Sequence, residues 1–104
     1  MGNGDFEIIE EKTPEYTKFT VKGQVNSGSA DKLQSKLLNA LHEGQKNLIL
    51  NMLWVKFLSS AGIRVILKIY KETNDAGGKF GIEKPSPNVK NVLGMTALDE
   101  LLIK

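Results

Sequence analysis

Alternating apolar and polar residues near the start of the chain predict two β-strands. Every second residue of Tyr16–Lys22 suits burial, with lysine and threonine between, which is the period of a strand with one buried face. Phe6–Lys12 gives a weaker pattern, because Ile8 and Ile9 are adjacent. Thr13-Pro14-Glu15 separates the two segments and favours a turn. We therefore expect an antiparallel hairpin.

A helical period follows, and then a short apolar run. Apolar residues recur three and four positions apart in the segment 30–41, as on one buried helix face. Asn26-Ser27-Gly28-Ser29 provides oxygens that cap a helix start, and Gly44 suits the helix end. Asn47–Met52 is a mostly apolar run, typical of a parallel strand buried on both faces.

A second amphipathic helix is predicted to begin near Ser60 and to stop at Asp75–Gly78. Its polar stripe runs from Ser60 through Arg64, Lys68 and Glu72 at intervals of four residues, which places these side chains on one helix face. The predicted apolar face contains Ile63, Ile66, Leu67 and Tyr70, and is widened by Val65 and Ile69.

The remaining chain predicts one more strand and a short helix. Lys79–Glu83 suits a third parallel strand. Ser86-Pro87 pairs a capping hydroxyl with a proline fit for the first helical position, so we expect a helix through Val89–Leu93. The tail Leu98–Ile103 is apolar enough that we expect it to dock on the sheet edge or on a helix.

This order of elements predicts an α/β fold in a single domain, residues 1–104. From the second strand onward, strands and helices alternate as in right-handed βαβ units. We expect a mixed, mostly parallel sheet of four to five strands with an antiparallel N-terminal strand, and three to four helices. A chain of 104 residues has a common size for one domain.

Composition excludes several classes of protein. The chain has no cysteine, which rules out disulfides and thiolate chemistry. Its 14 basic and 12 acidic residues are scattered and leave a net charge of +2, so we expect no direct nucleic-acid binding. Met1–Glu11 lacks a signal-peptide core, and the longest nearly uncharged run, Asn47–Val55, is too short to span a membrane. We expect a cytoplasmic protein.

Catalysis has little support in the sequence. His42 is the only histidine and falls on the polar face of the first helix, where a surface role is expected. No carboxylate pair or metal-ligand cluster is apparent. Gly77-Gly78 reads as a helix stop, because no phosphate-loop pattern surrounds it. We predict neither an enzyme, nor a cofactor, nor a metal.

Parallel sheets collect functional groups beyond the carboxyl ends of their strands. This rule selects two segments, Gly23–Ser27 and Asn51–Gly62. Ser60 has its hydroxyl at a helix start, beside unpaired N–H groups and the positive end of the helix dipole, which together tolerate a phosphate. Gly62 would leave room for an incoming enzyme or partner. The alternative is that Ser59 or Ser60 is only an N-cap worth about 1 kcal/mol.

Three segments resemble STAS domains of the anti-sigma-factor-antagonist family. Asn51–Leu67 is similar to the family's strand end and Ser-Ser-Gly helix start, Gly23–Asn26 to its Gly-x-Leu-Asp segment, and Lys84–Leu93 to its third-helix entry. The resemblance implies a protein that binds an anti-sigma factor, itself a serine kinase, and so frees a sigma factor. Phosphorylation by that kinase would end the binding, and a serine phosphatase would restore it.

The resemblance places the phosphorylation on Ser60, with Ser59 as second choice. Asn26, Asn51 and Ser59 stand where the family often has aspartate, which removes negative charge around Ser60. The expected partner-binding residues are Asn26, Ser27, Asn51, Trp54, Ser59, Ser60, Ala61, Gly62, Arg64 and Lys68.

Three points stay open at this stage. Arg64 and Lys68 suit an acidic partner or a solvated helix face equally. Trp54 and Phe57 lie in the expected connection before Ser59, where we expect Phe57 in the core and Trp54 either at a partner contact or not. The missing aspartates also suit a STAS scaffold that is never phosphorylated, a subunit of a larger signalling or transport assembly. We expect a monomer or a weak dimer.

Overall fold

A computed structural model describes residues 6–96 and residue 98. It contains one four-stranded sheet in the order β1-β2-β3-β4 and three helices. Strands β1 and β2 are antiparallel, whereas β2, β3 and β4 are mutually parallel. The elements are β1 (Glu7–Lys12), β2 (Thr17–Val25), α1 (Ser27–His42), β3 (Asn47–Leu58), α2 (Ser60–Asp75), β4 (Lys79–Glu83) and α3 (Pro87–Met95). The predicted fold class is confirmed.

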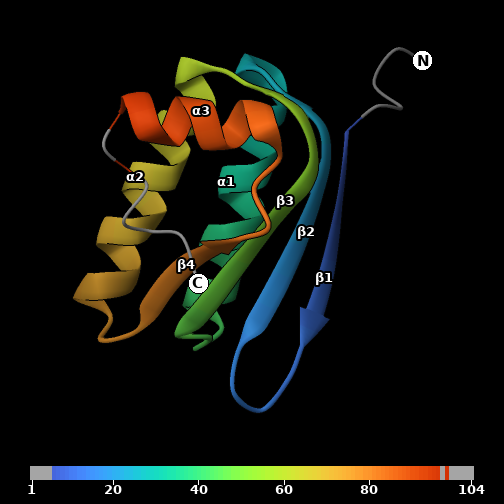
Figure 1. Cartoon of the computed structure of the whole chain (residues 1–104). Coiled ribbons are helices and arrows are strands. Elements are labelled where there is room, and N and C mark those ends of the chain that lie inside the picture. Colours follow the sequence, from blue (N-terminus) through green and yellow to red (C-terminus); the bar gives the residue numbers. More distant parts are fainter. Residues whose placement is uncertain (1–5, 97, 99–104) are drawn as a thin grey trace.

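Helices α1 and α2 cover the same face of the sheet (Figure 1). The chain steps from β2 to β3 to β4 in one direction, and right-handed crossovers then place both helices on one side. The core lies between them and the sheet. The opposite face of the sheet carries no helix among the described residues. The largest fully buried side chains are Phe19, Leu33, Leu37, Leu48, Leu50, Met52, Ile66, Ile69, Ile82 and Leu93.

Strand β3 is twice as long as the predicted segment, because it continues from Met52 to Leu58. Two register shifts against β2 each add one residue to β3, as β-bulges do. Trp54 and Phe57 therefore lie in the strand rather than in a connection. The expectation of a core position for Phe57 is wrong, because 52% of it is exposed. The bulges broke the alternation that would have identified the strand.

The buried face of α2 is turned relative to the predicted one. Leu67 was expected on this face, but 45% of it is exposed, while Ile63 and Tyr70 are only half-buried. The helix packs on the sheet through a different set of side chains from the predicted one. The spacing of apolar residues in the sequence allowed either set. The buried residues are Gly62, Val65, Ile66, Ile69 and Thr73.

Helix α3 covers the edge of β3 that β4 leaves free. Ser86 caps the helix as predicted, by accepting from the Val89 N–H, and its hydroxyl donates to the Val55 carbonyl at 2.7 Å. The Asn88 amide donates to the Lys56 carbonyl at 2.8 Å. These bonds satisfy strand carbonyls that would otherwise lack partners. Of the predicted tail, Leu98 packs against the core, and residues 99–103 lie outside the described residues.

One ion pair crosses the open face of the sheet. Lys18 Nζ in β2 lies 2.8 Å from Glu83 Oε2 in β4, spanning β3. No other donor in the described part of the chain reaches this buried oxygen, so Lys18 alone compensates its charge. The contact with the Glu83 carboxylate raises the pKa of Lys18 above its ordinary 10.5, against the opposing effect of burial.

This ion pair predicts a loss of stability in alkaline solution. Because the folded pKa of Lys18 is raised, the contribution is fully present below pH 10.5 and is lost as the pH rises through the folded value. Urea unfolding of wild type and Glu83→Gln between pH 8 and 12 measures it. The stability difference between the two proteins should shrink above pH 10.5, and a difference that stays constant across this range would contradict the assignment.

Candidate functional site

The starts of α1 and α2 lie side by side at the carboxyl edge of the sheet. Val25 ends β2 and Leu58 ends β3, and these two residues are neighbours in the parallel register. Each is followed at once by a helix N-cap, Asn26 for α1 and Ser59 for α2. The Ser59 N–H donates to the Val25 carbonyl at 2.9 Å, which ties the two starts together. We call the edge formed by these two strand ends and the first residues of α1 and α2, including Ser60, the rim.

The two serines of the rim have different environments. The Ser59 hydroxyl oxygen accepts from the Gly62 N–H at 3.2 Å, so it is the N-cap of α2. Ser60 is the first helical residue and is exposed. Within residues 6–96 its hydroxyl has no hydrogen-bond partner. The rim therefore presents a free hydroxyl beside the unpaired N–H groups of the first helical turn.

Asn26 is committed to capping α1. Its Oδ1 accepts from the Gly28 and Ser29 N–H groups, both at 3.1 Å, and the Asn26 N–H donates to the Ser29 hydroxyl at 2.9 Å. The Ser29 hydroxyl in turn donates to the Gln24 carbonyl at 2.7 Å. This reciprocal arrangement is a capping box. It holds the α1 half of the rim in place.

Removing this cap predicts a clear thermal effect. Asn26→Ala should cost about 1 to 2 kcal/mol, which lowers the melting temperature by about 4 to 8 °C per kcal/mol for a domain of this size. Asn26→Asp is the matched control, because it keeps the acceptor oxygen and should melt close to wild type. Scanning calorimetry measures both. Equal losses in the two variants would show that the cap oxygen is not the source.

Gly62 makes room for the core rather than for a partner. It is buried, and a Cβ added to it would lie 2.6 Å from Leu58 Cδ1 and 2.8 Å from Val25 Cγ1. The first turn of α2 can therefore pack closely on the two strand ends. Our expectation that Gly62 clears space for an incoming protein is wrong, because the position that a side chain would occupy faces Val25 and Leu58 in the core.

Asn51 does not flank Ser60. It lies within β3 beside Thr20 of β2, and Thr20 is five residues before Val25, which is about 16 Å along the strands. Its Oδ1 accepts from the Leu53 N–H at 3.1 Å. The end of β3 was placed too early, and the error carried Asn51 into the predicted site. Trp54 is also not part of the rim, but lies just below it in β3, beside Lys22 and three β2 residues before Val25.

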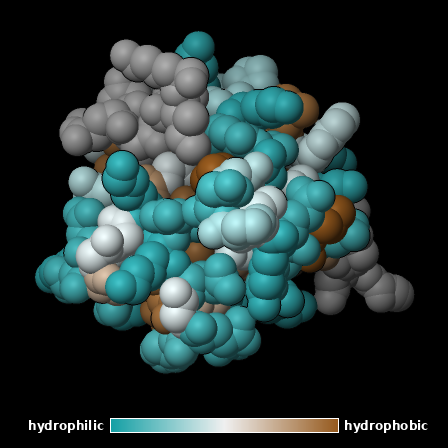
Figure 2. Space-filling model, turned by 90° about the horizontal axis from the view of Figure 1, so that it is seen from below, coloured by the Kyte–Doolittle hydropathy of each residue, from teal (hydrophilic) through white to brown (hydrophobic). Residues whose placement is uncertain are grey.

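The remaining predicted residues lie at the rim or just below it on α2. Ser27 begins α1 and is exposed, and Ala61 is half-buried. Arg64 and Lys68 are exposed on α2, where Lys68 lies 3.8 Å from Glu72. The other end of the molecule, seen from below in Figure 2, shows mostly hydrophilic residues with isolated hydrophobic ones.

The described residues contain neither a metal-binding cluster nor a helix that could cross a membrane. No group of three or more acidic or histidine side chains in residues 6–96 is placed to hold a metal ion. None of the helices in that range has the length and apolar character needed to cross a bilayer. What the rim does present is an exposed serine hydroxyl at the start of α2, next to the start of α1.

The chain is thus a small α/β domain whose sheet edge carries an exposed serine at a helix start. The sequence pattern of the STAS domain family matches residues 7–104, and the chain belongs to this family. It is 29% identical over 72 residues to the anti-sigma factor antagonist BtrV of Bordetella bronchiseptica, a match spanning 69% of this chain and 62% of BtrV. An anti-sigma F factor antagonist of Paenibacillus polymyxa is 25% identical over 79% of this chain and 71% of its own.

The fold is similar to that of the anti-sigma factor antagonist SpoIIAA. The unphosphorylated form of SpoIIAA superposes with a TM-score of 0.82 at 20% identity, covering 94% of this chain and 85% of SpoIIAA. The phosphorylated form from Bacillus gives a TM-score of 0.76, also at 20% identity, covering 94% and 88%. At this identity the likeness concerns the fold alone.

Proposed function

We propose that this chain is an anti-sigma factor antagonist, a binding module switched by phosphorylation of Ser60. The observation that carries the proposal is the position of Ser60, exposed at the first turn of α2 and next to the start of α1. A kinase can reach its hydroxyl, and a partner that covers the rim must also cover it. The names of the relatives and the STAS family support the same function.

Ser60 is a better phosphate acceptor than Ser59. Modification of Ser59 would require its oxygen to leave the Gly62 N–H, whereas the Ser60 hydroxyl has no such bond within the described residues. The Ser60 oxygen would take the γ-phosphoryl group of a nucleoside triphosphate, releasing the diphosphate and losing its proton to a base of the kinase. The product adds about −1.5 to −2 charges at the rim.

The phosphate changes the complex rather than the fold. A negative group at the start of α2 is favoured by about 0.3 to 1 kcal/mol, because the helix dipole is positive there. A partner that buries the rim would instead have to desolvate the new charge. A penalty of about 3 kcal/mol would weaken binding on the order of a hundredfold, which is sufficient for a switch.

The second candidate is a STAS scaffold that binds its partner without phosphorylation. It is favoured by Asn26 and Ser59, which stand where the family often has aspartate and leave less negative charge near Ser60, whereas Asn51 lies too far along β3 to contribute. The Oδ1 of Asn26 is in any case engaged in the α1 cap, which leaves its Nδ2 group as the part of the amide that can contact a kinase. Both candidates use the rim as a binding surface, and only the first needs the Ser60 hydroxyl.

Intact-mass measurement separates the two candidates. Wild type, Ser60→Ala and Ser59→Ala are each incubated with nucleoside triphosphate and an anti-sigma factor serine kinase of the same organism. One phosphate should be gained by wild type and by Ser59→Ala, but not by Ser60→Ala. Tight binding to the kinase with no change of mass would support the scaffold. Phosphate on the Ser60→Ala variant would overturn the assignment to Ser60.

A further inference from the structure

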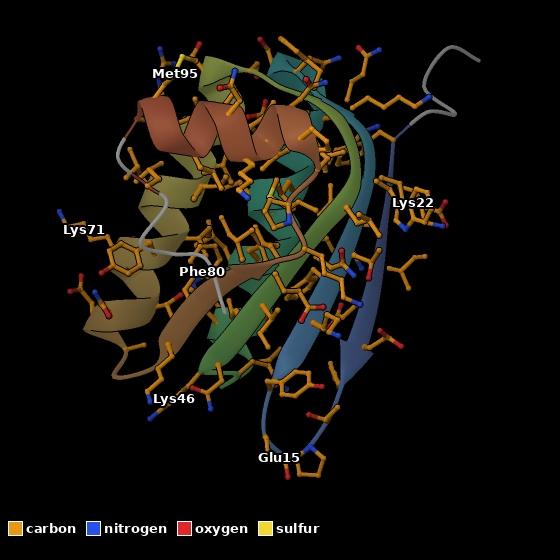
Figure 3. The ribbon with its side chains drawn as sticks, viewed as in Figure 1. Glu15, Lys22, Lys46, Lys71, Phe80 and Met95 are labelled. Carbon is orange, nitrogen blue, oxygen red and sulfur yellow. The ribbon has the colours of Figure 1, made fainter. Side chains whose placement is uncertain are left out.

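The open face of the sheet carries two exposed aromatic side chains close to the rim. Trp54 is 57% exposed and Phe57 is 52% exposed. In the register with β2, Trp54 lies beside Lys22 and Phe57 beside Gln24. Lys22 and Gln24 alternate with buried residues that face the helices, so they and their β3 neighbours lie on the open face. Figure 3 shows Lys22 on the side of the sheet away from the helices.

The two bulges of β3 create this arrangement. Residues three apart on a regular strand point to opposite faces, but each register shift adds one residue to β3. The shift between Val55 and Phe57 therefore returns Phe57 to the same face as Trp54, while Val55 and Leu58 are buried on the other. Bulges are common where a strand aims side chains at a binding site.

Lysines flank these aromatic residues. Lys22 lies beside Trp54, and Lys56 is exposed immediately before Phe57. Glu7 of β1 stands opposite Lys22, yet neither lysine is within ion-pair distance of a carboxylate in the range 6–96. We call Lys22, Trp54, Lys56 and Phe57 the sheet patch. It combines an apolar centre with two lysines that form no ion pair among the described residues.

We infer that the partner contacts the sheet patch and the rim at the same time. Phosphorylation of Ser60 weakens the contact at the rim, whereas the contact at the sheet patch does not change. Phe57 and Gln24 are the strand neighbours immediately before Val25 and Leu58, so the patch is continuous with the rim. Its occupant is an amphipathic segment of the anti-sigma factor, with apolar residues against the aromatic rings and acidic residues against the lysines. This inference rests on the proposed function.

A second copy of the chain fits the sheet patch less well. Two patches facing each other would bring four lysines together, which like-charge repulsion opposes. An acidic partner removes that repulsion and neutralises the same charges. Large aromatic side chains at the centre of an interface dominate binding, whereas surrounding contacts contribute little. The patch therefore supplies affinity that does not depend on the state of Ser60.

Trp54 provides its own spectroscopic probe, because it is the only tryptophan in the chain. Titration with a purified anti-sigma factor of the same organism should shift its emission to shorter wavelength and protect it from acrylamide. By calorimetry, Trp54→Ala and Phe57→Ala should each weaken binding about thirtyfold. Leu67→Ala is the matched control, since Leu67 is exposed on α2, and should change the affinity about twofold or less.

Several outcomes would overturn the inference. Ser60-dependent binding with unchanged Trp54 emission and a normal Trp54→Ala variant would leave the proposed function intact and remove the patch from the interface. No binding by wild type would remove both. A dimer of the chain alone that Trp54→Ala dissociates would assign the patch to a second copy. An emission shift with phosphatidylserine vesicles in the absence of the partner would assign it to a membrane surface.

Discussion

Gly78→Ala should destabilise the domain by about 3 kcal/mol or more, enough to unfold a large fraction of a domain of ordinary stability. An added Cβ would lie 1.8 Å from the Lys46 carbonyl oxygen and 2.6 Å from its carbon. These are backbone atoms, so no side chain can move aside to relieve the clash. The same carbonyl accepts from the Lys79 N–H at 2.9 Å, which starts the pairing of β3 with β4.

Gly77→Ala is the control for this prediction. Gly77 has a φ of +81°, and an added Cβ there would meet nothing within 4 Å. The substitution introduces backbone strain of about 1 to 2 kcal/mol without a clash. Urea unfolding of the two variants should therefore show a clearly larger loss for Gly78→Ala. Equal losses would mean that helix termination, and not the contact with Lys46, decides the cost at both positions.

Ser60→Asp should bind the anti-sigma factor on the order of ten- to a hundredfold more weakly than wild type. The aspartate carries one negative charge at the exposed start of α2, so it reproduces part of the effect of a phosphate. Its melting temperature should stay equal to that of wild type or rise slightly, because the helix dipole favours the charge. Titration calorimetry and scanning calorimetry measure the two quantities.

Two variants make the Ser60 result specific. Ser60→Ala keeps the rim neutral and should bind like the unmodified protein. Ser59→Ala removes the α2 cap, since Ser59 accepts from the Gly62 N–H, and should lose about 1 kcal/mol of stability with little effect on binding. If Ser60→Asp binds like Ser60→Ala, negative charge at the rim is not the switch, and the scaffold becomes the better description.

The order and direction of the strands and helices could be predicted because each element carries a local signal. Alternation identified β2, and the helical period identified α1. The segment Asn26–Ser29 and Ser86 marked helix starts through the chemistry of their side chains, and the structure shows Asn26 and Ser86 as the N-caps. These signals depend on neighbours in the sequence, which is why they can be read without coordinates.

The end of β3 could not be predicted in the same way. Its two bulges depend on pairing with β2, a segment about thirty residues earlier in the chain. The alternation fails after Met52, and the remaining residues resembled a loop. This one error placed Asn51 near Ser60 and Phe57 in the core.

The sequence by itself determined the α/β fold, the family and the serine at a helix start, because period, capping chemistry and family segments are local properties. Only the tertiary structure decided that Ser60 rather than Ser59 has the free hydroxyl, that Gly62 and Gly78 serve close packing, and that two aromatic residues share the open face. Each of these depends on the distance between atoms far apart in the chain, which a linear pattern does not contain.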